Sequence, residues 1–245
     1  MAPRSLLLIQ VGTPPDHIRA TTGDIPAWFV DAVDDVPVRM DVVEVYKGHA
    51  LPEPGRHDAA LITGSWSMVT DRHDWSEATA EWIRRAVGAG MPVMGVCYGH
   101  QLMAHALGGT VDYHPEGREM GCLDVELLPT GQDDPWLQGC PATFKANLTH
   151  SQSVLALPAG AVALARSAHD PHQAVRYAPH AVSVQFHPEI TPAILAACIQ
   201  AHGDDLRAEG FDTAALLDDL VDTPTPQTLL QRFVQGHGTA ASDQD

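Results

Sequence analysis

One strand-to-helix turn constrains the fold of this chain more than any other feature. The apolar run Pro92–Cys97 leads directly into an expected helix at Tyr98–Leu107, and Cys97 stands between Gly95 and Gly99. A nucleophile on such a tight turn takes a strained backbone conformation, and small neighbouring residues give it room. The N-terminus of the helix favours thiolate over thiol. The turn therefore predicts an α/β fold in which Cys97 projects from a sheet as a nucleophile.

Apolar runs in the first half of the chain are typical of parallel strands. They are Ser5–Gly12, Arg39–Tyr46, Asp58–Thr63 and Pro92–Cys97. The first, third and fourth are almost continuously apolar, as strands buried on both faces of a sheet are. A helix is expected at Asp74–Ala89, with a capping box formed by Asp74 and Glu77. Its apolar face would contain Trp75, Ala78, Trp82 and Ile83.

The second half changes to short strands separated by Pro and Gly turns, and then to helices. The expected strands are Gly109–His114, Cys122–Leu128, Thr143–Leu148, Ala161–Ser167, Gln173–Tyr177 and Ala181–Phe186. The expected helices are Pro192–His202, Thr213–Val221 and Thr225–Gln235. We therefore expect an α/β fold with a mostly parallel central sheet flanked by helices, a small antiparallel extension and a C-terminal helical segment. Residues 1–190 would form one domain and residues 191–245 a helical extension packed on it, with a disordered tail from about residue 239.

Charge and cysteine content limit the classes of function. The 245 residues carry a formal net charge of −17, which argues against binding to nucleic acids or anionic membranes. No apolar run reaches the length of about 18 residues that a membrane span needs, and the N-terminal run lacks the features of a signal peptide. The four cysteines are scattered, without the spacing of a zinc site or a disulfide framework. We therefore expect a cytoplasmic protein without a metal or a cofactor.

Cys97 needs a base to take its proton and a group to orient that base. An expected strand ending at Phe186 is followed directly by His187-Pro188-Glu189, which would place His187 at a strand end facing a cleft. Pro188 stiffens the turn, so Glu189 can hold the imidazole in one tautomer. The alternative is a buried cysteine that only fills core space. The strand before Cys97, the helix after it and the His–Glu pair downstream weigh against that alternative.

Two segments together resemble the class I glutamine amidotransferases. They are Gly95-Val96-Cys97-Tyr98-Gly99-His100-Gln101-Leu102 and Gln185-Phe186-His187-Pro188-Glu189. The resemblance runs from about Leu6 to Glu189 and is strongest to the amidotransferase domain of GMP synthetases and its free-standing relatives. It implies a flavodoxin-like fold and an enzyme that cleaves the side-chain amide of glutamine through a γ-glutamyl thioester, releasing ammonia. By this resemblance Cys97 would be the nucleophile, His187 the general base and then acid, and Glu189 its orienting group.

The resemblance also implies which residues contact the substrate. Ile62–Val69 matches the oxyanion loop of the family, so the N–H groups of Ser65 and Tyr98 would form the oxyanion hole. The other residues expected to contact substrate are Gly64, Gln101, Ser151 and Gln152. Thr149–Val154 matches the segment whose backbone holds the amino acid end of glutamine. Gly117–Gly121 matches a further recurring element, for which a structural role is expected.

Three positions depart from the family pattern. Ser65 replaces a Gly and Trp66 a Pro in the oxyanion loop, and Gln152 replaces the acidic residue of the GMP synthetase pattern His-Gly-Asp. No Gly-rich phosphate loop follows Glu189, so ammonia would pass to a synthetase on a separate chain. The departures keep open a hydrolase of γ-glutamyl peptides or amides. A non-catalytic binding module is a third interpretation, which the intact triad disfavours. The helical tail could be a lid, a homodimer surface or a docking face, but packing on the sheet edge is favoured.

Overall fold

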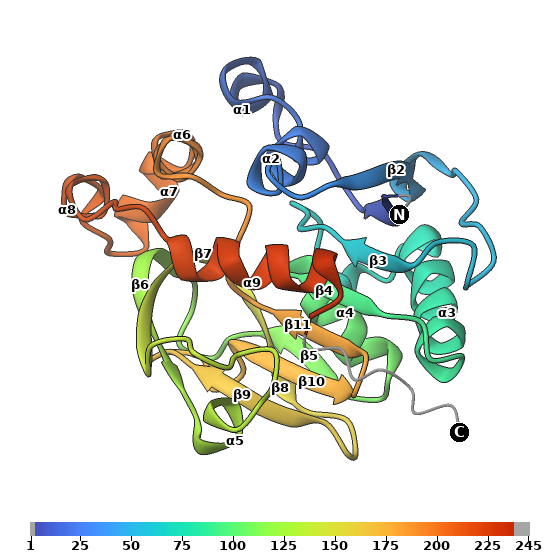
Figure 1. The fold of residues 1–245 in the computed structure, drawn as a ribbon. Coiled ribbons are helices and arrows are strands. Elements are labelled where there is room, and N and C mark those ends of the chain that lie inside the picture. Colours follow the sequence, from blue (N-terminus) through green and yellow to red (C-terminus); the bar gives the residue numbers. More distant parts are fainter. Residues whose placement is uncertain (1–2, 238–245) are drawn as a thin grey trace.

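A computed structural model describes residues 3–237, and a nine-stranded sheet forms its centre (Figure 1). The strands lie in the order β2-β1-β3-β4-β11-β10-β9-β6-β7. Along the chain they are β1 Arg4–Gln10, β2 Val38–Glu44, β3 Ala59–Ile62, β4 Val93–Val96, β6 Glu119–Leu127, β7 Thr143–His150, β9 Val162–Arg166, β10 Ala174–Ala178 and β11 Ala181–Val184. A separate antiparallel pair consists of β5 Thr110–Tyr113 and β8 Gln152–Ala156.

The sheet changes from parallel to antiparallel at β11. The neighbours β2, β1, β3, β4 and β11 are parallel, whereas β10, β9, β6 and β7 continue the sheet in antiparallel fashion. Every residue of β3, β4 and β11 is buried, as expected for central strands that helices cover on both faces. The α/β class predicted from the sequence is confirmed.

Helices cover both faces of the sheet (Figure 1). They are α1 Asp16–Thr22, α2 Ile25–Ala32, α3 Asp74–Gly88, α4 Tyr98–Ala106, α5 Pro129–Gln132, α6 Pro192–Ala201, α7 Gly203–Ala208, α8 Thr213–Asp218 and α9 Pro224–Gln235, with short 3-10 turns at η1 Val45–Lys47 and η2 Val69–Asp71. Side chains of α2, α6 and α9 share a core with Leu6 and Leu8 of β1. Those of α3 and α4 share a second core with Leu7 and Ile9, because successive strand residues point to opposite faces.

The start of α3 differs from the sequence prediction. The predicted capping box is wrong, because Asp74 is already helical and the N-cap, His73, makes no side-chain capping bond. Glu77 instead accepts a hydrogen bond from Arg72 at 3.3 Å and lies 3.1 Å from His105 Nε2. These two partners hold the Glu77 carboxylate away from the N-cap backbone.

Other differences arise where the apolar pattern carries little information. The structure contains α1, α2, α5, α7 and β8, for which no helix or strand was expected. Helix α2 is predominantly apolar because it packs between the sheet and α9, so its sequence lacks a strong polar face. In α3, Ala78 is exposed, and Thr79 and Ala80 take the buried positions next to it. The expected disordered tail from about residue 239 lies outside the described residues.

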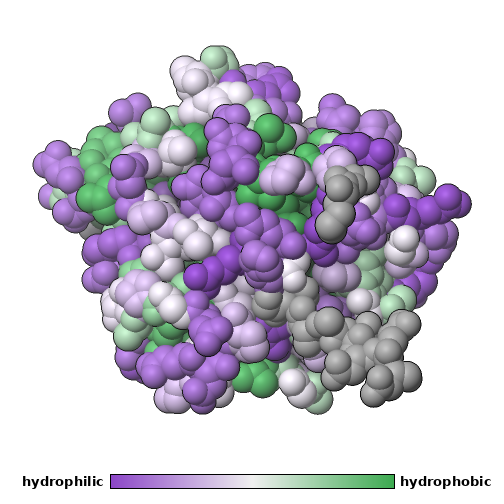
Figure 2. Space-filling view, in the orientation of Figure 1, coloured by the Kyte–Doolittle hydropathy of each residue, from purple (hydrophilic) through white to green (hydrophobic). Residues whose placement is uncertain are grey.

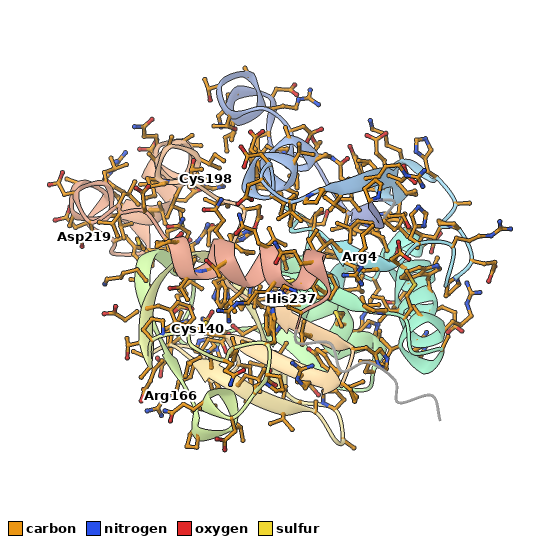
Figure 3. All side chains as sticks on the ribbon, in the orientation of Figure 1. Arg4, Cys140, Arg166, Cys198, Asp219 and His237 are labelled. Atoms are coloured by element: carbon orange, nitrogen blue, oxygen red, sulfur yellow. The ribbon has the colours of Figure 1, made fainter. Side chains whose placement is uncertain are left out.

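The C-terminal helices are joined to the sheet by apolar packing and by hydrogen bonds. Phe233, in α9, is fully buried in the same core as β1 and β7, and α9 crosses in front of β4 and β11 in Figure 1. Trp136 Nε1 donates a hydrogen bond to Leu229 O at 3.0 Å. Arg4, at the start of β1, donates to Val234 O at 2.9 Å, and Figure 3 shows Arg4 beside the end of α9.

The molecular surface drawn in Figure 2 is predominantly hydrophilic, with small apolar patches, one of them at the left over the C-terminal helices. Asp and Glu outnumber Lys and Arg by 31 to 14, so much of this polar surface is acidic. Within residues 3–237, no helix combines the length and the apolar character that crossing a membrane requires.

Candidate active site

A cavity of about 200 Å³ lies at the edge of the sheet where the parallel strands end. Residues that follow β3, β4 and β11 line it, together with the end of β7. Ligands of parallel α/β sheets bind at this carboxyl edge, because the loops that leave the strands converge there. Gly64, Cys97 and His187 therefore meet at one cavity although they are far apart in the sequence.

Cys97 occupies the strained turn that the sequence predicts. Its φ and ψ are 50° and −101°, in a region that costs a residue with a side chain about 1–3 kcal/mol. Its N–H donates to Val184 O of β11 at 2.9 Å, and its carbonyl accepts from Gln101 N of α4 at 3.0 Å. Strand and helix thus hold the turn in place, and the Cys97 side chain lines the cavity with only 6% of the residue exposed.

The glycines on either side of Cys97 allow backbone segments to touch. A Cβ on Gly95 would lie 2.4 Å from Gly99 O, and a Cβ on Gly99 would lie 2.4 Å from Ile62 O. Neither separation is compatible with ordinary van der Waals contact. The N–H of Gly99 also donates to Thr63 O at 3.1 Å. Glycine is thus required at both positions for the turn to pack against the end of β3.

His187 and Glu189 form a buried pair beside Cys97. The His187 Nδ1–H donates to Glu189 Oε1 at 2.8 Å, which leaves Nε2 as the atom that can exchange a proton. Within residues 3–237, His187 Nε2 is buried and has no hydrogen-bond partner. A Cβ built on Gly64 would lie 3.0 Å from His187 Cε1 and 3.6 Å from Cys97 Cβ, so both side chains border Gly64.

Two opposing effects act on the pKa of His187. Burial disfavours the imidazolium and lowers the pKa, whereas the Glu189 carboxylate and the Cys97 thiolate favour the imidazolium and raise it. The charges prevail, so the pKa of His187 lies well above its usual value of 6.5. The Glu189 carboxylate and the neighbouring Cys97 thus favour the imidazolium form of His187 inside the cavity.

Two backbone N–H groups in the cavity are available to a ligand. Ser65 and Tyr98, the residues predicted to form an oxyanion hole, both line the cavity. In the part of the chain that the structure describes, their N–H groups donate to no acceptor. The Ser65 side chain is bound elsewhere, because its Oγ donates to Val11 O at 3.0 Å and accepts from Ser67 N at 3.0 Å. Ser65 therefore retains the backbone donor that the family Gly would supply.

The predicted substrate contacts Gln101 and Gln152 lie in the cavity wall, and their side chains are bound to other protein groups. Gln101 Nε2 donates to Gln152 O at 2.6 Å and to Gln185 Oε1 at 3.0 Å. Gln152 Oε1 accepts from Val69 N at 3.1 Å, and its Nε2 donates to Thr70 Oγ1 at 2.5 Å. The Gln152 side chain thus holds η2 against the cavity wall through Val69 and Thr70. Gly64 and Ser151 also line the cavity.

A buried polar network, which was not predicted from the sequence, supports this wall. His150 Nε2 lies 2.8 Å from Glu119 Oε2, and His150 Nδ1 lies 2.9 Å from Gln152 O. Glu119 also accepts from Ser167 Oγ at 2.6 Å and from Gln173 Nε2 at 2.7 Å. Burial raises the pKa of Glu119, but His150, the hydrogen bond from Ser167 and the charge of His169 together lower it by more, so the pKa of Glu119 lies below its usual value. Glu119 belongs to the segment Gly117–Gly121, which also contributes Arg118 to the cavity.

The sequence analysis missed an apolar wall and a cation of the cavity. Trp28, from the unexpected helix α2, meets Trp66 edge-on with ring centroids 6.4 Å apart, and both line the cavity. Arg118 lines it as well, and its guanidinium pairs with Glu209. Of these three residues, only Trp66 stood out in the sequence as a possible wall of the cavity, because it replaces the Pro of the family pattern. Among residues 3–237, no group of three or more His, Cys, Asp or Glu is arranged to hold a metal ion.

Comparisons with known proteins agree with this geometry. The family model "Glutamine amidotransferase class-I" matches residues 28–197. The glutamine-hydrolyzing GMP synthase of Thermomicrobium roseum is 41% identical over 111 residues, which make up 45% of this chain and 20% of that protein. The glutamine-hydrolyzing GMP synthase of Aeropyrum pernix is 38% identical over 143 residues, which make up 58% of this chain and 26% of that protein. The chain therefore spans about a fifth to a quarter of the length of these curated relatives.

Solved structures share the fold over almost the whole chain. The crystal structure of a glutamine amidotransferase from Thermotoga maritima has a TM-score of 0.75 at 20% identity and covers 95% of this chain and 97% of that chain. A glutamine amidotransferase from Methylobacillus flagellatus has a TM-score of 0.74 at 22% identity and covers 99% of each chain. The second likeness thus includes the C-terminal helices.

Gly99→Ala should destabilise the protein through the contact with β3. Its Cβ would lie 2.4 Å from Ile62 O, so we expect the free energy of unfolding in urea to fall by at least about 2 kcal/mol. Gly88→Ala is the matched control, because Gly88 ends α3, is exposed and has nothing within 4 Å of an added Cβ. It should leave stability unchanged or raise it by up to about 1 kcal/mol. Equal effects of the two substitutions would contradict the steric account of Gly99.

Proposed function

Because this chain belongs to the class-I glutamine amidotransferase family, we propose that it hydrolyses the side-chain amide of glutamine with Cys97 as the nucleophile. The observation that carries the proposal is the buried His187–Glu189 pair beside Cys97. Both Glu189 and Cys97 raise the pKa of His187. Both members of that pair and Cys97 line one cavity. The curated relatives are named as glutamine-hydrolyzing synthases, and this supports glutamine as the substrate.

In the first half of the reaction, the Cys97 thiolate attacks the carboxamide carbon and a C–S bond forms. The carbonyl oxygen becomes an oxyanion, to which the N–H groups of Ser65 and Tyr98 donate. When the tetrahedral intermediate collapses, the C–N bond breaks and His187 Nε2 gives its proton to the leaving nitrogen. Ammonia leaves, and a γ-glutamyl thioester remains on Cys97.

In the second half, water attacks the thioester carbon while the now neutral His187 takes a proton from it. Collapse of the second tetrahedral intermediate breaks the C–S bond and releases glutamate. Cys97 is again a thiolate and His187 again an imidazolium, so the cycle is closed with one water consumed. Glu189 stays charged throughout and holds the His187 ring through the 2.8 Å hydrogen bond to Nδ1.

We further propose that the ammonia passes to a synthetase. Support comes from the GMP synthases, which this chain matches over about a fifth to a quarter of their length. All four cysteines are free thiols, which suits a reducing compartment such as the cytoplasm.

Cys97→Ala tests the nucleophile. We expect ammonia release from glutamine to fall to the background rate, because no thioester can form. Circular dichroism and urea unfolding should show an intact fold. Cys140→Ala is the matched control, since Cys140 does not line the cavity, and it should keep full activity. Ammonia release that persists in the Cys97→Ala protein would refute the assignment.

Glu189→Gln tests the electrostatics of the pair through the pH dependence of kcat. Loss of the carboxylate leaves burial as the larger effect, so the pKa of His187 should fall. The acid that protonates the leaving nitrogen is then lost at lower pH, and the alkaline limb of the profile should move to lower pH. We also expect kcat at its optimum to drop by about 100- to 10,000-fold. An alkaline limb that stays in place would contradict this role of Glu189.

The apolar wall favours a second candidate function, the hydrolysis of γ-glutamyl amides that carry an apolar amine. Ammonia is small and polar and gains nothing from an apolar surface. Ile25, Trp28, Trp66 and Met68 nevertheless line one side of the cavity, and Trp66 stands where the family usually has Pro. An aromatic or aliphatic leaving group would bury apolar area against these side chains.

Trp66→Ala separates the two candidate functions. If the wall binds an apolar leaving group, kcat/KM for a γ-glutamyl anilide should exceed that for glutamine in the wild type. The substitution should then lower kcat/KM for the anilide by about 10- to 100-fold and leave that for glutamine within a factor of about three. Trp66→Phe, which keeps an aromatic ring, should have a smaller effect. A wild type that prefers glutamine, with no selective loss in Trp66→Ala, would exclude the second candidate.

A further inference from the structure

Arg118 is the one permanent positive charge at the active-site cavity. Among the described residues that line the cavity, no other is a Lys or an Arg. The chain carries a net charge of −17, so a lone cation at the cavity is not a reflection of overall composition. A fixed cation in the wall of a small cavity favours a ligand with a negative charge.

The register of the sheet places Arg118 in the wall of the cavity, beside Ser151. Glu119, the first residue of β6, pairs with His150, so Arg118 lies beside the position of Ser151. Thr149, Ser151 and Gln152 line the same cavity as Cys97. A ligand whose amide lies at Cys97 could therefore present an anionic group to Arg118.

The guanidinium is held in place, and one corner is left for a ligand. Arg118 Nε donates to Glu209 Oε2 at 3.0 Å, and its Nη2 donates to Glu209 Oε1 at 3.1 Å. Within residues 3–237, no acceptor is found for Nη1. The side chain is 21% exposed, so Glu209 fixes the plane of the guanidinium without enclosing it. A planar guanidinium fixed in this way suits the geometry of a carboxylate.

The neighbouring carboxylate of Glu119 does not neutralise Arg118. Successive residues of a strand point to opposite faces, and Glu119 is buried with hydrogen bonds to His150, Ser167 and Gln173. Glu209, at the end of α7, is 40% exposed, so solvent screens its charge. The pair Arg118–Glu209 thus retains attraction for a further anion that enters the cavity.

We infer that Arg118 binds the α-carboxylate of the γ-glutamyl group and thereby selects substrates that carry it. The inference rests on the proposed function, because it takes the amide at Cys97 as the other end of the ligand. It holds for glutamine and for larger γ-glutamyl amides alike, since both have this carboxylate. Arg118 is then a specificity residue, and Glu209, from the C-terminal segment, is its positioning partner.

The test compares L-glutamine with L-glutaminamide, in which a neutral amide replaces the α-carboxylate. In the wild type, kcat/KM should favour L-glutamine by about 10- to 100-fold, the factor that a charge-assisted hydrogen bond gives. In Arg118→Gln this ratio should fall to near one, chiefly through a higher KM for L-glutamine. Arg118→Lys keeps the charge but loses the planar fork, so it should keep part of the preference.

Two further variants separate recognition from structure. Glu209→Gln removes the ion pair but keeps Arg118, so it should retain the preference with a smaller loss of kcat/KM. Arg166→Gln removes another guanidinium–carboxylate pair, with Glu126, on an exposed part of the sheet. Figure 3 shows Arg166 at the lower left, away from Cys198, which lines the cavity. Arg166→Gln should leave the preference unchanged.

Calorimetry gives the same comparison without turnover. It measures the binding of L-glutamine and of L-glutaminamide to the Cys97→Ala protein, with and without Arg118→Gln. A wild type that releases ammonia from neither amide would refute the proposed function. An unchanged preference for L-glutamine in Arg118→Gln, in turnover and in binding, would refute the role of Arg118 and leave the function standing. A preference for L-glutamine that vanishes as fully in Glu209→Gln as in Arg118→Gln would contradict direct binding of the carboxylate by Arg118, because the guanidinium remains in the Glu209→Gln protein.

Discussion

Direct contact between backbone segments at the two glycines around Cys97 is the constraint on which the rest of the site depends. Gly95 lies against the carbonyl of Gly99, and Gly99 lies against the carbonyl of Ile62. No side chain fits between these segments, so the turn after β4 can take only one position relative to the end of β3. That position aims Cys97 into the cavity and leaves the N–H groups of Ser65 and Tyr98 without acceptors in the described chain. Close packing at two glycines thus sets the direction in which the Cys97 side chain faces the cavity.

Electrostatics then divides the cavity into two ends. At one end the buried Glu189 favours the protonated form of His187, although burial alone would oppose it. At the other end Arg118 contributes a cation that Glu209 keeps in place. Between them the wall is neutral, and Gln101 and Gln152 are bound to backbone and side-chain partners. A ligand with a polar amide at one end and an anion at the other matches this distribution of charge.

The sequence predicted those features whose cause is local. The turn at Cys97 was recognisable because a buried strand, two glycines and a helix follow one another within a few residues, and the order of strands and helices around it was foreseen for the same reason. The pairing of Arg118 with Glu209 joins residues that are 91 positions apart, and no local pattern marks it. Helix α2 was missed because it is apolar on most of its surface, so periodicity could not reveal it. The capping box failed at Glu77 because partners from other segments compete for the same carboxylate.

The place of β11 in the sheet has a consequence for the chain as it leaves the ribosome. β4 is made early, but its second neighbour, β11, is made only after β5 to β10, and Val184 of β11 accepts the hydrogen bond from Cys97 N. A nascent chain that ends before β11 therefore lacks both the bond that holds the Cys97 turn and the histidine beside it. Insertion of β11 between β4 and β10 is a long-range step and is accordingly slow. Cys97 and His187 consequently come together only when the sheet is completed.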